Sequence, residues 1–308
     1  MGFWRNKEGR VRLSWRLLGI IGLVFLLSMI AWPLLYFTAT LQGYRGHELL
    51  QVVEKRSLFI SPLIMLGVVM LFAFVFDKMK GKNMGLTWNR ERGSQFSFGF
   101  VLGGLLVIFV FLIHYILSYA MVKGYSWQFQ EPGGWWTPLA TGLLLFLPVS
   151  LGEEMLGRGY FINHFAGSSL LAVLGSALFF GSLHLLNPSI GLLAFFNIFL
   201  VGVLFAYMYL WSGSLWMPIG FHLSWNWFMG YVFNYPVSGV ANEKSLFLIN
   251  VEGPALITGG SFGPEASLLV TFLLVIGFFL TKKHLQKKGF PCPLNKVLSS
   301  DLSPLLHD

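Results

Sequence analysis

Residues 137–163 have the sequence TPLATGLLLFLPVSLGEEMLGRGYFIN, and they indicate the class of protein. The stretch is long enough to cross a bilayer as a helix, which takes about 20 mostly apolar residues. It nevertheless carries Glu153, Glu154 and Arg158 close together in its second half. A charge at the centre of a bilayer costs at least about 2.5–3.5 kcal/mol. The stretch therefore predicts a membrane helix whose charged residues have a function.

The composition of the whole chain agrees with a membrane protein. Of the 308 residues, 55% are apolar and only 11% are charged, whereas about 25% are charged in a typical soluble domain. A soluble fold with this composition would expose apolar patches far larger than the few hundred Å² that monomers tolerate. Disorder is excluded as well, because disordered chains combine low hydrophobicity with high charge.

Eight stretches are long and apolar enough to be membrane spans, and alternation typical of a transmembrane barrel is absent. We expect these spans near residues 17–40, 58–76, 96–122, 137–163, 169–186, 189–211, 214–234 and 264–281. The predicted fold class is an all-α, polytopic membrane helix bundle of about eight transmembrane helices with a buried polar active-site pocket.

The distribution of Lys and Arg predicts the orientation in the membrane. Residues 1–16, 77–95 and 282–308 hold five each. The opposite side holds Arg45, Lys55, Arg56, Lys123 and Lys244. Fifteen Lys and Arg residues on one side against five on the other predict a multi-pass protein of the cell membrane with both termini in the cytoplasm. This bias explains the net charge of +8, so nucleic acid is not an expected partner.

We expect three parts along the chain. Residues 1–130 would form three N-terminal spans with a cytoplasmic N-terminus. Residues 131–235 would form a catalytic membrane core, and residues 236–308 an outer loop, the last span and a cytoplasmic tail. The single cysteine, Cys292, excludes an intramolecular disulfide framework and a CxxC redox motif.

Residues 132–242 contain only three charged side chains, which suggests that they divide their roles. Glu154 and Arg158 are four residues apart with the acid first, the better order for an ion pair on a helix. Glu153 points about 100° away from Glu154 on a helix and has no partner in this segment. An unpaired carboxylate in an apolar site suits a general base or acid.

Two other predicted spans supply complementary groups. His184 ends one span, and His222 and Asn226 share a face of another because they are four residues apart. Together with Glu153 these groups suit the activation of water and the stabilisation of an oxyanion. A metal site is the alternative, because two His and one Glu form a known catalytic zinc set: His184, His222 and Glu153. The sequence establishes no cofactor, and zinc is the possible one.

These residues form three motifs in a fixed order. Glu153–Arg158 matches EExxxR, Phe180–His184 matches FxxxH, and His222–Asn226 matches HxxxN. Their order and separation resemble the CPBP (CAAX protease or Abi) family of intramembrane endopeptidases, which includes the type II CAAX prenyl endopeptidases. The resemblance covers about residues 135–230, and Gly202–Pro218 is similar to the family's stretch before its last histidine.

The resemblance implies a role for each motif residue. Glu153 would be the catalytic glutamate that activates water, and His184 would help to position or deprotonate that water. His222 and Asn226 would bind the water or stabilise the tetrahedral oxyanion. Both a metal-dependent and a metal-free glutamate mechanism have been proposed for such proteins, and the HExxH helix of the zincins is absent here.

The other two motif residues, Glu154 and Arg158, would be structural and hold the motif helix. The implied function is an intramembrane endopeptidase, with a peptide or lipidated protein as substrate and the lipid bilayer around it. The substrate would be a prenylated CAAX-type tail, a small peptide such as a bacteriocin precursor, or a membrane-anchored protein. Two alternatives stay open: a proton-coupled membrane carrier, and a non-catalytic family member that acts as a scaffold or immunity protein.

Overall fold

The computed structural model describes residues 4, 11–128, 134, 136–165, 168–241 and 244–289. The α-helices are α1 Leu13–Leu41, α2 Gly46–Met70, α3 Arg90–Ile116, α4 Trp136–Glu154, α5 Phe161–His164, α6 Ser169–Leu183, α7 Leu192–Ser212, α8 Trp216–Trp227, α9 Ala255–Thr258 and α10 Leu268–Lys287. The π-helical segments are Leu71–Phe76, Met155–Tyr160 and Phe228–Val232. Short 3₁₀ turns lie at Gly81–Met84, Ser126–Gln128, Gly260–Phe262 and Pro264–Ala266. The predicted all-α, polytopic bundle is confirmed, and Cys292 lies outside the described residues.

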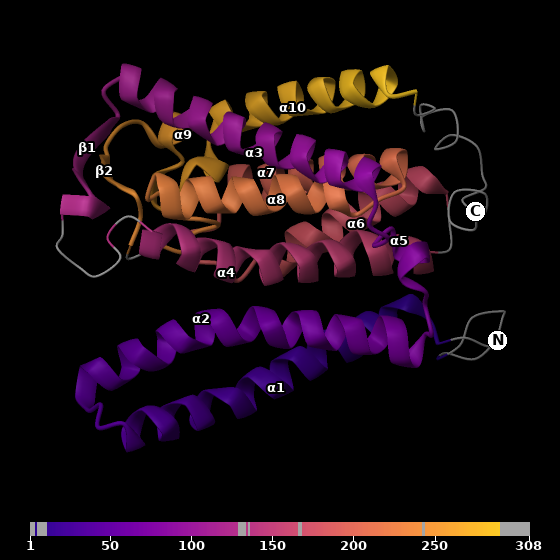
Figure 1. The fold of residues 1–308 in the computed structure, drawn as a ribbon, viewed down its shortest axis with the longest axis horizontal. Helices are drawn as coiled ribbons and strands as arrows, with labels where there is room; N and C mark the ends of the chain where they lie inside the picture. The colour runs from indigo at the N-terminus through magenta and orange to yellow at the C-terminus, as the bar shows by residue number, and fades with distance from the viewer. Residues whose placement is uncertain are drawn as a thin grey trace.

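One small β-ribbon accompanies the helices. Strand β1, Ala120–Tyr125, pairs antiparallel with β2, Phe247–Val251. Figure 1 shows this ribbon and the turn between α1 and α2 at one end of the bundle, and the start of α1 and the end of α10 at the other end. We call these ends the ribbon end and the termini end.

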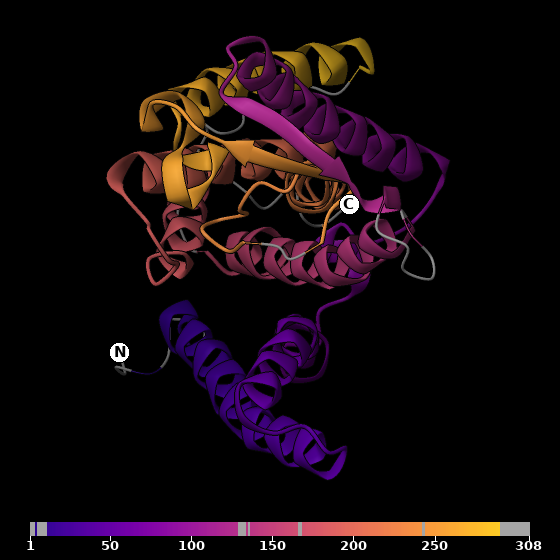
Figure 2. The same ribbon diagram turned by 90° about the vertical axis from the view of Figure 1, so that its left-hand side faces the viewer.

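The helices form a hairpin and a larger group. Helices α1 and α2 pack on each other as a hairpin, and α2 packs on α4. Helix α8 lies in the middle of the larger group, with α4 on one side and α3 on the other, and α10 lies beyond α3 and α7 (Figure 1). Figure 2 shows that the hairpin projects away from this larger group. The residues that carry the sequence motifs therefore belong to the larger group.

The predicted count of eight membrane spans is not confirmed. Among the described residues, six helical segments are long and apolar enough to cross a membrane: Leu13–Leu41, Gly46–Phe76, Arg90–Ile116, Trp136–His164, Leu192–Ser212 and Leu268–Lys287. The spans expected at 169–186 and 214–234 are shorter helices. Helix α6 has 15 residues, and α8 has 12 residues followed by a π-helical segment.

Two of the differences from the predicted boundaries change where residues lie. Helix α2 begins at Gly46 rather than near residue 58, so Lys55 and Arg56 lie on a helix and not in a loop. Helix α3 ends at Ile116 rather than near residue 122, because Ser118 has a positive φ of 58° that a helix does not accommodate. The chain then pairs with β2, a partner too distant in sequence for an apolar window to reveal.

Glycines bring the backbones of α3 and α8 together. A Cβ on Gly99 would lie 2.1 Å from the carbonyl oxygen of Met217, and one on Gly103 would lie 2.6 Å from that of Phe221. A Cβ on Gly220 of α8 would in turn lie 2.3 Å from a backbone oxygen of α3. Small residues are the usual means of close helix packing in membranes. This contact fixes α8, which carries the HxxxN motif, in the centre of the bundle.

Candidate active site

The EExxxR motif lies where α4 changes to a π-helical segment. Helix α4 ends at Glu154, and Met155–Tyr160 continue with the wider π geometry, which often occurs at functional sites. Arg158, in this segment, donates from Nη1 to Oε1 of Glu154 over 2.9 Å and from Nη2 to the carbonyl oxygen of Gly202 over 3.1 Å. The side chains of Glu154 and Arg158 are fully buried. The predicted ion pair between them is therefore confirmed.

Two aromatic rings cover the buried guanidinium. The Cζ atom of Arg158 lies 4.5 Å from the ring centroid of Phe180 and 5.1 Å from that of Phe205. An arginine over the face of an aromatic ring gains a cation–π attraction, which is larger where water is excluded. The contact with Arg158 explains why a phenylalanine stands in the FxxxH motif. Phe205 makes a similar contact, although no sequence motif marks it.

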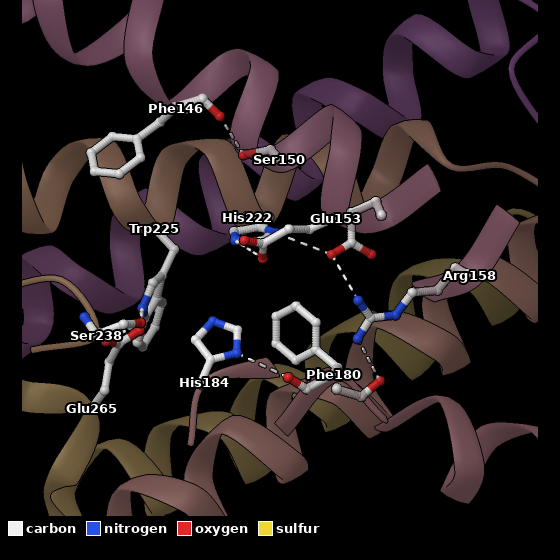
Figure 3. Close-up of polar contacts among 12 residues, drawn as sticks. Phe146, Ser150, Glu153, Arg158, Phe180, His184, His222, Trp225, Ser238 and Glu265 are labelled. Atoms are coloured by element: carbon white, nitrogen blue, oxygen red, sulfur yellow. Dashed lines mark hydrogen bonds and ion pairs between the residues drawn. The ribbon is translucent and has the colours of Figure 1, made fainter. Parts of the chain in front are cut away.

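His222 contacts both glutamates of the EExxxR motif. Its Nδ1 lies 3.0 Å from Oε1 of Glu154, and its Nε2 lies 3.7 Å from Oε2 of Glu153. The dashed lines in Figure 3 mark these contacts. A carboxylate that accepts the Nδ1 proton fixes the tautomer and the orientation of an imidazole. Glu154 therefore orients His222 as well as pairing with Arg158, a contact that the sequence interpretation missed.

Glu153 has an oxygen without a hydrogen-bond donor. Its Oε2 atom is buried and accepts no hydrogen bond from the residues that the structure describes. The side chain is 18% exposed and lines a cavity of about 940 Å³. Buried polar atoms almost always have a partner, because an unpaired one costs about 1–3 kcal/mol. A water or substrate group in the cavity would supply the missing donor.

His184 and Asn226 line the same cavity. His184 directly follows α6, and its Nδ1 lies 2.9 Å from the carbonyl oxygen of Phe180, which leaves Nε2 for other contacts. Asn226 lies one turn after His222 on α8 and is 6% exposed. Figure 3 shows Glu153, His222 and His184 around one space. The structure thus brings the four residues predicted to be catalytic together, while their chemical roles stay predictions.

The rest of the cavity wall is largely apolar. It includes Phe59, Pro62, Met65, Leu145, Phe146, Val149, Ile198, Val201, Phe205, Tyr231, Val270 and Leu274. A concave, mostly apolar pocket with a few convergent polar groups is typical of a ligand-binding site.

Sequence reasoning missed the part that Glu265 plays in the cavity wall. Glu265 accepts from Nε1 of Trp225 over 3.2 Å, and from the backbone N and Oγ of Ser238 over 2.6 and 3.0 Å. Its own carbonyl oxygen accepts from Nδ2 of Asn197 over 2.8 Å. Glu265, in the turn just before α10, therefore connects α7, α8 and the loop after α8. No motif marks this residue, because its partners come from three other segments of the chain.

The structure leaves the zinc alternative as a prediction. Among the described residues, no three His, Cys, Asp or Glu side chains are already grouped around one metal position. Nδ1 of His222 contacts Glu154 and Nδ1 of His184 contacts a backbone carbonyl, so Nε2 is the ring nitrogen that each histidine offers to other groups. Metal-bound histidines commonly make such a second contact as well.

Comparison with known proteins supports the motif interpretation. Residues 135–228 match a family model described as type II CAAX prenyl endopeptidase Rce1-like. The matched segment includes the three motifs, from Glu153 to Asn226. Curated proteins and solved structures give no match. The EExxxR, FxxxH and HxxxN residues that meet around this cavity thus lie in the segment that is similar to the Rce1-like type II CAAX prenyl endopeptidase model.

Proposed function

We propose that this protein is an intramembrane endopeptidase that hydrolyses a peptide bond with a water activated by Glu153. The buried Oε2 of Glu153, which accepts no hydrogen bond from the described residues, carries the proposal. It faces Nε2 of His222 at 3.7 Å inside the cavity. That separation is too long for a direct hydrogen bond, and a water beside both atoms would bond to each.

The hydrolytic step conserves atoms and charge without a cofactor. Glu153 takes a proton from the water while the water oxygen bonds to the carbonyl carbon of the substrate. The carbonyl oxygen becomes an oxyanion. The carbon–nitrogen bond then breaks, and Glu153 passes the proton to the leaving amine. General acid–base catalysis of this kind contributes about 10²–10⁴-fold to a rate.

The neighbouring residues would stabilise the charges of this step. His184 would help to hold the water, and His222 and Asn226 would donate hydrogen bonds to the water or the oxyanion. Such donors act strongly where bulk water is excluded. Glu154 and Arg158 would be positioning residues, since Glu154 holds the ring of His222 and Arg158 neutralises Glu154.

The cavity supports a substrate with an apolar segment. Its largely apolar wall and its volume of about 940 Å³ would accept several side chains or a lipid group. The family name favours a prenylated CAAX-type tail, and a small peptide precursor or a membrane-anchored protein is the alternative.

A matched pair of glutamate variants tests the proposal. Wild type, Glu153→Gln and Glu48→Gln are purified in detergent and assayed with prenylated and unprenylated peptides, with and without chelator. Glu48 is exposed on the first turn of α2 and does not line the cavity. We expect Glu153→Gln to lose at least about 100-fold in cleavage rate, and Glu48→Gln to keep the wild-type rate. Retained activity in Glu153→Gln would overturn the mechanism.

Two further readouts separate the alternatives. A cleavage rate that rises with the content of bound metal and is abolished by chelator would support the zinc alternative. Absence of cleavage by folded wild type would favour a carrier or a non-catalytic scaffold, and pH-gradient-driven flux in proteoliposomes would identify the carrier.

A further inference from the structure

The cavity extends from the motif residues toward only one end of the bundle. Its lining comes from residues 51–65 of α2, residues 137–153 of α4 and residues 197–205 of α7. It also comes from the end of α6, the end of α8, the loops that follow both, and the beginning of α10. The lining thus reaches from just beyond the middle of these helices to the ribbon end.

The exposed residues of the lining locate the opening. They include Gln51, Glu54, Lys55, Leu58, Thr137, Leu183, Val240, Ala241 and Lys244. These residues belong to the first half of α2, the start of α4, the end of α6 and the loop before β2, and the hairpin stands apart from the larger group toward the ribbon end (Figure 2). The opening thus combines charged, polar and apolar side chains, whereas the wall beyond it is mostly apolar.

Glu153 lies deep in the cavity. It follows Thr137 by 16 residues along α4, a helical length of about 24 Å. An extended chain advances about 3.4 Å per residue. A peptide that enters at the ribbon end would therefore need about seven extended residues to bring its scissile bond to Glu153.

The distribution of Lys and Arg among the described residues predicts which end of the bundle faces the cytoplasm. The termini end carries Arg12, Arg16, Lys78, Lys80, Lys82, Arg90, Arg92, Lys282, Lys283, Lys287 and Lys288. The ribbon end carries Arg45, Lys55, Arg56, Lys123 and Lys244. Lys and Arg accumulate on the cytoplasmic side of membrane proteins. The termini end is therefore the cytoplasmic one, and the cavity opens away from the cytoplasm.

We infer that the substrate reaches Glu153 from the non-cytoplasmic side of the membrane. The inference rests on the proposed function and narrows its substrate class. The substrate is an exported peptide, or the non-cytoplasmic segment of a membrane-anchored protein. On this inference, a lipidated tail that stays in the cytoplasm is not the substrate.

Cysteine labelling tests the direction of the opening without requiring activity. Cys292 is replaced by serine, and single cysteines are introduced as Thr141→Cys and Leu144→Cys. Both sites lie on α4; Thr141 lines the cavity, whereas Leu144 does not and is 70% exposed on the outside of the bundle. In sealed right-side-out vesicles we expect a small membrane-impermeant thiol reagent to modify Thr141→Cys and to leave Leu144→Cys unmodified.

A second pair of variants reports the sidedness of the whole protein. Lys123→Cys on β1 and Lys82→Cys in the turn Gly81–Met84 are both exposed, one at each end of the bundle. In sealed right-side-out vesicles, the reagent is expected to modify Lys123→Cys at once and Lys82→Cys only after permeabilisation. The reverse pattern, or modification of Thr141→Cys only from the cytoplasmic side, would overturn the inference.

Cleavage in oriented vesicles tests the consequence for the substrate. A soluble quenched peptide with about eight residues on one side of its scissile bond is added to sealed right-side-out or inside-out vesicles. We expect at least tenfold faster cleavage with right-side-out vesicles and equal rates after permeabilisation. Faster cleavage by sealed inside-out vesicles contradicts the inference but leaves the endopeptidase proposal intact. Absence of cleavage in permeabilised vesicles contradicts the proposed function, while the labelling still decides the direction of the opening.

Discussion

Oε1 of Glu154 lies 3.0 Å from Nδ1 of His222 and also binds Nη1 of Arg158 at 2.9 Å. One carboxylate oxygen thus connects the EExxxR motif to the HxxxN motif across two helices. Since all three side chains are buried or nearly so, the negative charge of Glu154 is balanced inside the protein. This arrangement leads to the first prediction.

Replacement of Glu154 by glutamine is expected to destabilise the protein strongly. It removes the charge that balances Arg158, and breaking a buried ion pair from one side costs about 3–5 kcal/mol. Thermal unfolding in detergent measures the loss. The double variant Glu154→Gln/Arg158→Met is expected to unfold at a higher temperature than Glu154→Gln alone, because it leaves no buried charge unpaired. A double variant that unfolds at the same temperature as Glu154→Gln, or at a lower one, would contradict a dominant charge effect.

Phe180→Leu is expected to weaken the support of the guanidinium. The ring lies 4.5 Å from Cζ of Arg158, and a desolvated cation–π contact contributes up to about 2 kcal/mol. The free energy of unfolding should therefore fall more in the wild-type background than in an Arg158→Met background. A double-mutant cycle on purified protein measures the difference, and a coupling energy of zero would refute the contact.

Alanine at Gly99 is expected to disrupt the packing of α3 on α8. The new Cβ would lie 2.1 Å from a backbone oxygen, so the helices must separate, and overpacking usually costs about 1–3 kcal/mol. Gly67→Ala in α2 is the matched control, because a Cβ there meets no atom within 4 Å. That variant should keep or raise the unfolding temperature, since alanine favours a helix more than glycine does.

Glu265→Ala is expected to loosen one wall of the cavity. It leaves Nε1 of Trp225 and the backbone N of Ser238 without their acceptor, at a cost of about 1–3 kcal/mol for each buried group. Because Trp225 lines the cavity, we expect KM to rise more than kcat falls. Trp225→Phe alone and with Glu265→Ala complete a double-mutant cycle, and strictly additive effects on KM would speak against the coupling.

The sequence was most informative where one segment carried the whole signal. Apolar content predicted the membrane bundle, and the only charged residues of 132–242 marked the site that α4, α6 and α8 now bring together. The spacing of Glu154 and Arg158 predicted their ion pair, because that contact is made within one helix.

The features that sequence reasoning missed depend on contacts between distant segments. The bond from His222 to Glu154 and the three bonds to Glu265 each join different elements. Helices α6 and α8 were expected to be full spans, because the apolar pattern continues through the turns and the π-helical segment that follow them. Window hydropathy does not measure where a helix ends.

The wall of the cavity has a consequence for engineering. Residues 135–228 contain all three motifs, but Phe59, Pro62 and Met65 come from before this segment, and Glu265 and Val270 come from after it. A graft of residues 135–228 into another membrane scaffold would carry the reactive groups. It would lack the parts of the cavity wall that α2 and the region around the start of α10 supply. Transplanted activity would require the host to replace α2 and the region in front of α10 as well.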